Sequence, residues 1–251
     1  MSKSSLVDCT VLSPNHSGKR THSIDRITPH CVVGQLSAKR IGECFAKGRN
    51  ASCNYGIGKD GKVSLIVDET YRSWCSSSRS NDQRAVTIEC ASDLKSPYAM
   101  NKEVYNKLID LCVDICKRNG KKKLIWIANK NKALAYNPKS DEMLITVHRW
   151  FANKPCPGDW LYSRLDDLAN KVTTKLSGSP NKTTTTPQNT KPFKVKVIAK
   201  TLNVRKGAGV LYPTVVTIKK NEVYTIAKVN KDWGKLKSGL GWINLKYTKR
   251  V

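Results

Sequence analysis

Acidic residues are scarce in this chain of 251 residues, which has 19 aspartates and glutamates against 45 lysines and arginines. The net charge of +26 argues against positively charged partners and favours polyanionic ones, such as nucleic acid, anionic lipid or a wall rich in phosphate polymers. Long apolar runs are also missing, since none approaches the roughly 18 residues of a membrane span. The first residues lack a basic stretch followed by an apolar core. We therefore expect a protein without a membrane span, made in the cytoplasm and not secreted by a signal peptide.

Cysteines are present, but not in the patterns that define common cysteine sites. There are nine of them, an odd number, without the spacing of a disulfide framework and without a CxxC pair. This usage suits a reducing compartment, where most cysteines are expected to be small buried apolar residues. The lack of CxxC also argues against a structural zinc site with four protein ligands.

A polar segment divides the chain. Residues 177–192, SGSPNKTTTTPQNTKP, contain no apolar side chain that could form a core, which predicts a flexible linker between domains at 1–176 and 193–251. Up to residue 176 there are 29 basic and 17 acidic residues, and from residue 177 onward there are 16 basic and 2 acidic ones. The C-terminal part is therefore the more basic one per residue.

The two domains show different periodicities. Up to residue 176, strand and helix patterns alternate, which predicts an α/β domain with a mixed central sheet flanked by helices. After the linker only short strands follow, which predicts a small all-β barrel. In the first domain we expect strands at 27–34, 53–58, 62–68, 84–92 and 121–128, a hairpin turn at 59–61, and helices at 37–48, 101–117 and 160–176.

Histidine is rare, and its positions are informative. Of the four histidines, His30 and His148 lie in the apolar stretches ITPHCV and LITVHRW. A single strand histidine is more often a hydrogen-bonded core residue than a metal ligand. However, Cys156 follows His148 by eight residues, and prolines and a glycine near it turn the chain back. His30, His148 and Cys156 would together form a three-ligand zinc site that leaves the fourth position to water.

These residues resemble the zinc N-acetylmuramoyl-L-alanine amidases, a family that includes phage lysozyme-like amidases and peptidoglycan recognition proteins. The resemblance covers roughly residues 20–175. Its most specific part is the pattern H-x5-K-x-C, here His148, Lys154 and Cys156, followed by Pro-Gly and a closing helix. The family's first histidine, at the end of an early strand, matches His30. The resemblance thus implies the same three zinc ligands.

Amide hydrolysis at such a centre needs a base and a group that stabilises the oxyanion. Glu89, in the strand RAVTIEC, matches the family's glutamate and is the expected general base. Lys154 is expected to place its ammonium beside the oxyanion. The alternative interpretations are that Lys154 is a solvated surface lysine and that Glu89 is one half of a buried ion pair.

The segment CNYGIGKDGK at residues 53–62 resembles the family's H-Y-x-I-x-x-D-G hairpin. Asn54 stands where the family usually has histidine, and Cys53 stands where some phage members have a catalytic tyrosine. Tyr55 lies two residues further, on the same face of a regular strand as Cys53. We therefore expect Asn54 and Tyr55 to bind substrate and Glu89 to remain the base.

The C-terminal part resembles the bacterial SH3-like domain, whose hallmark L-N-V-R-x-G-x-G-x-x-Y-P is present at residues 202–213. The resemblance implies a cell-wall-binding domain at 193–251. We expect at least half of its large aromatic residues to pack in the barrel core, among Trp233, Trp242, Tyr212 and Tyr224.

The resemblances predict a phage or prophage endolysin that binds one Zn²⁺ and cleaves the amide bond between the lactyl group of muramic acid and L-alanine. Its partner would be peptidoglycan of a Gram-positive wall, reached after holin-dependent release, with anionic wall polymers bound by the basic domain. Nucleic acid is not expected, because the lysines are scattered, as at 117–123. Two alternatives stay open. One is a non-catalytic peptidoglycan binder, and the other is a wall peptidase with Cys156 or Cys53 as nucleophile and His30 or His148 as base.

Overall fold

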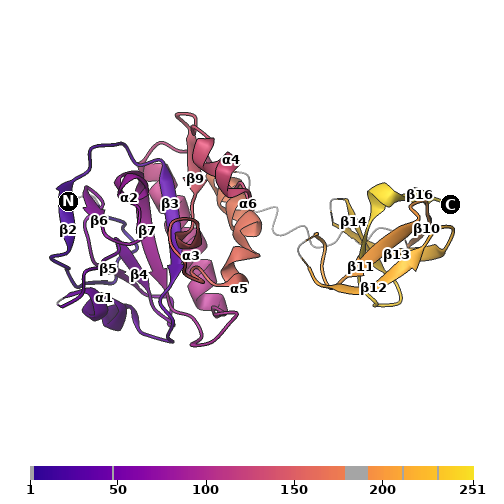
Figure 1. Ribbon diagram of the computed structural model, residues 1–251, viewed down its shortest axis with the longest axis horizontal. Coiled ribbons are helices and arrows are strands. Elements are labelled where there is room, and N and C mark those ends of the chain that lie inside the picture. Colours follow the sequence, from indigo (N-terminus) through magenta and orange to yellow (C-terminus); the bar gives the residue numbers. More distant parts are fainter. Residues whose placement is uncertain (1–2, 47, 179–191, 211, 231) are drawn as a thin grey trace. The chain divides into compact units, whose positions relative to one another are not determined.

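The computed structural model describes residues 3–46, 48–178, 192–210, 212–230 and 232–251 (Figure 1). The chain divides into two compact units, Met1–Asn181 and Lys182–Val251. Most of the linker expected at 177–192 falls outside the described residues. Within the described ranges, no helix is both long and apolar enough to cross a membrane.

The first unit is built around a seven-stranded mixed sheet in the order β1-β5-β4-β7-β3-β9-β8. Strands β4, β7, β3, β9 and β8 run parallel to one another, and β5 pairs with β4 as an antiparallel hairpin. The strands are β1 (Cys9–Thr10), β3 (Arg26–Cys31), β4 (Tyr55–Ile57), β5 (Val63–Leu65), β7 (Ala85–Cys90), β8 (Lys123–Ile125) and β9 (Glu142–Ile145). A separate two-stranded sheet joins β2 (His16–Lys19) to β6 (Tyr71–Ser73). The parallel strands end at one edge of the sheet, where open α/β sheets usually bind ligands.

Helices cover the sheet on both faces. Strand β4 shows this. A side chain at Gly56 would come within 2.7 Å of Ile41 in α1. The neighbouring Tyr55 instead hydrogen-bonds Glu69, which forms an ion pair with Arg118 in α3. Successive strand residues point to opposite faces, so α1 and α3 lie on opposite sides of the sheet. The helices are α1 (Ala38–Ala46), α2 (Arg79–Arg84), α3 (Lys102–Arg118), α4 (Lys130–Ala135), α5 (Asp159–Tyr162) and α6 (Leu165–Leu176).

The expected mixed sheet with flanking helices is thus confirmed, and so are the hairpin turn at 59–61 and the helices near 37–48 and 101–117. The single helix expected at 160–176 is wrong. It is divided into α5 and α6, because Ser163 Oγ and Arg164 both donate hydrogen bonds to the carbonyl of Trp160 and so end the first turn. The elements β1, β2, β6, α2 and α4 were not expected, since they are short and lack a clear apolar period.

The second unit is an antiparallel sheet in the order β12-β11-β15-β14-β13-β10-β16, the all-β architecture expected of an SH3-like domain. Its strands are β10 (Phe193–Val197), β11 (Thr201–Arg205), β12 (Thr214–Lys219), β13 (Val223–Asn230), β14 (Trp233–Leu236), β15 (Trp242–Asn244) and β16 (Thr248–Arg250). The expectation that at least half of the four named aromatic residues pack in the core is wrong. The fully buried core side chains are aliphatic, and of the four only Tyr224 packs against them, as a partly buried residue. Tyr212 is 48% exposed.

Candidate active site

Two parallel strands bring His30 and Glu89 together. His30 in β3 is the register partner of Glu89 in β7, and each is the fifth residue of a six-residue strand. Register partners point to the same face of a sheet. Here that is the face covered by α1, because Glu89 is also the register partner of Gly56. Nδ1 of His30 lies 3.9 Å from Oε1 of Glu89.

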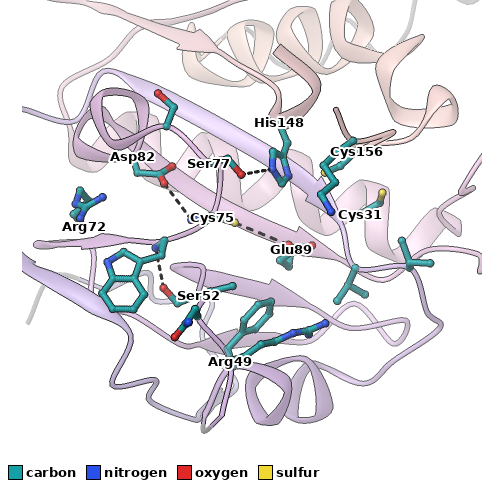
Figure 2. A pocket seen from close by; sticks show the side chains of 18 of the residues that line it. Cys31, Arg49, Ser52, Arg72, Cys75, Ser77, Asp82, Glu89, His148 and Cys156 are labelled. Atoms are coloured by element: carbon teal, nitrogen blue, oxygen red, sulfur yellow. Dashed lines mark hydrogen bonds between the residues drawn. The ribbon is translucent and has the colours of Figure 1, made fainter. Parts of the chain in front are cut away.

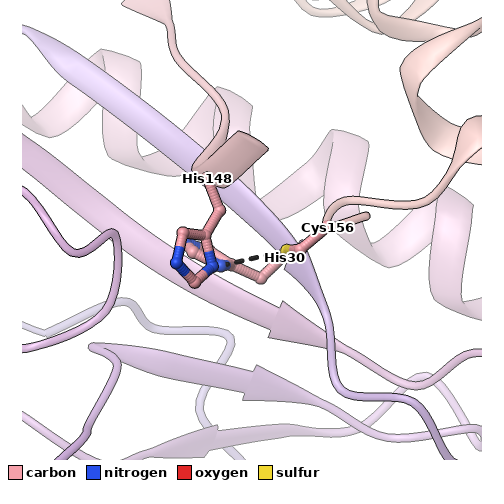
Figure 3. A group of neighbouring side chains, drawn as sticks. All are labelled: His30, His148 and Cys156. Carbon is pink, nitrogen blue, oxygen red and sulfur yellow. Dashed lines mark hydrogen bonds between the residues drawn. The ribbon is translucent and has the colours of Figure 1, made fainter. Parts of the chain in front are cut away.

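The segment after β9 supplies the other two expected ligands. The strand ends at Ile145, so His148 is not a strand residue as expected but begins a short 3-10 helix, His148–Trp150. The chain then turns back, and the backbone N–H of Arg149 donates to the carbonyl of Cys156 at 3.1 Å. This places Sγ of Cys156 3.2 Å from Nδ1 of His30 (Figure 3). A ring nitrogen of His148 also lies within 4.8 Å of Sγ of Cys156, so the expected return of Cys156 towards His148 is confirmed.

Gly158 allows this return. It has φ +81, a conformation that glycine adopts readily, and a Cβ at this position would come within 2.9 Å of both Tyr98 Cβ and Pro97 O. Glycine is therefore required for the loop to pack against the 97–98 segment. The same residue precedes α5, so no side chain caps that helix.

The three side chains offer donors that fit a zinc ion. One donor atom from each of His30, His148 and Cys156 lies within 4.8 Å of the others, and the two imidazole centroids are 5.1 Å apart. Burial lowers the pKa of His30 well below its usual value, which keeps the imidazole neutral as a metal ligand must be. His30 Nε2 and Glu89 Oε2 are buried and have no hydrogen-bond partner among the described residues. Two imidazoles and a thiol are typical zinc ligands.

A cavity of about 660 Å³ opens beside this cluster (Figure 2). Most of the charged residues that line the cavity are basic, and two are acidic. The basic residues are Arg49, Arg72, Arg79 and Lys154, and the acidic ones are Asp82 and Glu89. The wall also includes Trp74 and Phe45, so the cavity can contact both polar and apolar parts of a ligand.

Glu89 has the properties of a proton acceptor. Its side chain is 13% exposed, and burial raises its pKa to about 7, against the opposing effects of the Arg49 charge and a hydrogen bond from Cys75. A carboxyl group that titrates near neutral pH can accept a proton and later return it. Cys75, whose Sγ lies 3.9 Å from Glu89 Oε1, was not anticipated from the sequence. With His30 and Glu89 it forms a second group of close donor atoms.

Lys154 lies at the rim of the cavity as an exposed side chain. Its charge, after the larger effect of burial, lowers the pKa of His148. The ammonium is therefore close enough to the cluster to interact with it electrostatically.

The structure does not bring Asn54 or Tyr55 to the cavity. Asn54 is fully buried and hydrogen-bonds the backbone of Val67. Tyr55 is also fully buried, and its hydroxyl donates to Glu69 at 2.5 Å and accepts from the backbone N–H of Ser4 at 2.8 Å. The expected substrate-binding roles are therefore corrected, because both polar groups are satisfied inside the protein. Cys53, the other hairpin residue considered, is fully buried too.

The chain is similar to one known protein family and to several solved structures. The profile of a family described as N-acetylmuramoyl-L-alanine amidase matches residues 20–159. Among solved structures, PlyL is 12% identical with a TM-score of 0.45, covering 65% of this chain and 94% of that chain. The endolysin N-acetylmuramoyl-L-alanine amidase LysCS from Clostridium intestinale URNW is 14% identical with a TM-score of 0.43, covering 65% and 97%. The Staphylococcus aureus hydrolase AmiA is 13% identical with a TM-score of 0.47, covering 68% and 85%. No curated protein sequence matches the chain.

Proposed function

The chain belongs to the N-acetylmuramoyl-L-alanine amidase family, whose profile matches more than half of it, and we propose that it cleaves peptidoglycan at the cluster of His30, His148 and Cys156 with Glu89 as base. Its activity as a peptidoglycan amidase follows from the family. The single observation that carries the assignment of the site is the convergence of two imidazoles and one thiol at the edge of the parallel sheet, beside the cavity.

His30, His148 and Cys156 would hold one zinc ion. When bound, zinc acts as a Lewis acid that polarises the carbonyl of the scissile amide and makes water more acidic. Three protein donors would leave the fourth position of a tetrahedral zinc ion to water or substrate, which is typical of catalytic and not of structural zinc.

Glu89 would transfer the proton from the attacking water to the leaving group. Its carboxylate accepts the proton of the attacking water and passes it to the departing amine of L-alanine, which leaves as a neutral group. The unpartnered Oε2 of Glu89 supports this role, because no hydrogen bond within the described protein competes for it. Lys154, at the rim, would stabilise the negative charge that develops on the carbonyl oxygen.

The second unit would hold the enzyme on the wall. It has few acidic residues, and from residue 177 onward the chain has 16 basic and 2 acidic ones. Such a module is attracted to anionic wall polymers, which favours a Gram-positive wall as the target. The biological role proposed with it is that of an endolysin released by a holin. Partly exposed aromatic side chains such as Tyr212 offer contacts in addition to charge.

A wall peptidase with Cys156 as nucleophile is the second candidate, because the thiol lies 3.2 Å from an imidazole nitrogen. The electrostatics oppose it. A nucleophilic cysteine needs a lowered pKa, whereas burial raises the pKa of Cys156 well above its usual value. The thiol is also only 9% exposed.

The test combines metal analysis of the purified chain with mass spectrometry of digested cell walls. We expect one zinc per chain, and products in which muramic acid is separated from peptides that begin with L-alanine. Chelation should abolish this activity and zinc should restore it. Cleavage within the peptide stem, resistant to chelation and sensitive to thiol alkylation, would instead support the peptidase.

A further inference from the structure

Ser77 contacts one of the proposed metal ligands from outside the donor set. Its Oγ is hydrogen-bonded to Nε2 of His148 at 3.0 Å, although 71 positions separate the two residues (Figure 2). The hydrogen bond occupies one ring nitrogen of His148 and leaves Nδ1 as the other possible donor. Metal-bound histidines commonly donate their second N–H to a fixed acceptor, which determines the tautomer and the orientation of the ring.

The backbone at Ser77 is in an unfavourable conformation. Its φ is +61, a left-handed value that residues with a side chain adopt at a cost. Such a conformation persists only where the surrounding structure enforces it. The residues on either side of Ser77 show how this happens.

Helix α2 fixes the backbone of the loop that carries Ser77. The buried carboxylate of Asp82 accepts hydrogen bonds from the backbone N–H groups of Cys75 at 3.1 Å and Ser76 at 3.2 Å. On the other side of Ser77, the Oγ of Ser78 accepts from the backbone N–H of Asn81 and caps α2. The backbone of the loop is therefore held to α2 on both sides of Ser77.

Asn81 connects this loop to the segments that carry the metal ligands. Its buried amide donates to Thr28 Oγ1 in β3 at 3.1 Å and accepts from Thr146 Oγ1 at 3.0 Å. Thr28 lies two residues before His30, and Thr146 lies two residues before His148. The position of Ser77 is thus set with respect to both histidines by a buried hydrogen-bond network.

We infer that Ser77 is a positioning residue for the zinc site: its hydroxyl accepts the proton on Nε2 of His148 and so presents Nδ1 to the metal. The inference rests on the proposed function, since it requires His148 to be a ligand. Ser77 itself needs no contact with the metal or with substrate. Without the Ser77 hydroxyl, the His148 imidazole would exchange between two tautomers and several ring orientations. Only one combination presents Nδ1 to the zinc ion.

Three variants test this inference in the full-length chain. Ser77→Gly removes the hydroxyl and suits the positive φ, whereas Ser77→Ala removes the hydroxyl and keeps the unfavourable φ. Ser80→Ala is the matched control, because this exposed hydroxyl lies in the following helix α2 and is hydrogen-bonded to Ser78 Oγ, not to His148. The measurements are the zinc dissociation constant by competition with a chelator, the ¹⁵N spectrum of the His148 ring in the zinc-free protein, and the thermal unfolding midpoint.

We expect both Ser77 variants to bind zinc about 10- to 100-fold more weakly, the usual effect of losing a partner of a metal-bound histidine. The ring spectrum should change from the Nε2–H form to a mixture of tautomers, and Ser80→Ala should match the unmodified chain. In the zinc-free protein, the midpoint of Ser77→Gly should be no lower than that of the unmodified chain, so weaker zinc binding would not follow from instability. Unchanged zinc affinity and tautomer in both Ser77 variants would overturn the inference. Unchanged zinc affinity in His148→Ala would instead overturn the proposed zinc site.

Discussion

Nδ1 of His30 lies 3.2 Å from Sγ of Cys156, although 126 positions separate the two residues in the sequence. The strand β3 supplies the first residue, and a loop that turns back after β9 supplies the second. Because β9 is the direct neighbour of β3 in the sheet, both segments reach the same edge. The site is therefore a product of strand order.

Loss of any one donor should release the metal. We expect His30→Ala, His148→Ala and Cys156→Ala each to lose stoichiometric zinc and activity, because two remaining ligands rarely retain zinc. Metal content after dialysis and wall-lysis rate are the measurements. Cys9→Ala is the control, since this partly exposed thiol lies in β1 outside the donor set. An active, fully metallated Cys156→Ala would remove the thiol from the site.

Substitution of Glu89 should separate chemistry from metal binding. Glu89→Gln keeps the shape of the side chain but cannot accept a proton, so turnover should fall by about 10²-fold or more. Zinc content should stay at one per chain, because the carboxylate is assigned to the proton and not to the metal. Turnover near that of the unmodified chain would show that the base is another group.

Burial of Glu89 should also lower stability at neutral pH. Its pKa in the zinc-free fold is about 7, above the value of about 4.3 in unfolded chains. The folded state therefore binds the proton more tightly, so this group's contribution is fully favourable below about pH 4.3 and is lost as the pH rises through 7. Zinc-free Glu89→Gln should exceed the unmodified chain in unfolding free energy by roughly 3.5 kcal/mol at pH 8. At pH 5 the gain should be only about 1 kcal/mol. Urea unfolding in chelator measures both, and an equal gain at the two pH values would contradict the assignment.

Tyr55 should matter for stability and not for catalysis. Tyr55→Phe leaves Glu69 and the backbone N–H of Ser4 each without one buried hydrogen bond. We expect a loss of about 1–2 kcal/mol in unfolding free energy and little change in turnover. Chemical denaturation and the rate on a soluble muropeptide test the two expectations, and a large fall in turnover at unchanged stability would return Tyr55 to the active site.

We expect the first unit to carry the catalytic activity and the second unit to bind the wall. A chain of residues 1–176 should keep its activity on a small soluble muropeptide and lose much of it on whole walls, because the second unit concentrates the enzyme on an insoluble substrate. Added salt should reduce the advantage of the full chain, since part of the attraction is electrostatic. Equal losses on both substrates would indicate that the second unit shapes the active site.

Much of this organisation could be predicted from the sequence, because the patterns are local. The apolar periodicity and the hairpin turn at 59–61 predicted the main strands and helices of the first unit. The spacing of His148, Lys154 and Cys156 indicated the zinc site, since a loop of only eight residues that contains prolines keeps Cys156 close to His148. His30 and Glu89 stood out for a related reason, as polar residues near the ends of buried strands.

Only the tertiary structure decided the rest, because it depends on which strands pair and on which face each side chain lies. The hairpin sequence could not show that Tyr55 points away from the site, since its direction follows from the pairing of β4 with β7 and from α1 packing on Gly56. Nor could it reveal Ser77, which lies in a serine-rich loop and meets His148 only through the anchoring of α2 to β3. The sequence alone thus determined the chemical groups and the local elements. The fold decided which of those groups face one another, because burial and hydrogen bonding select one register among several that local patterns allow.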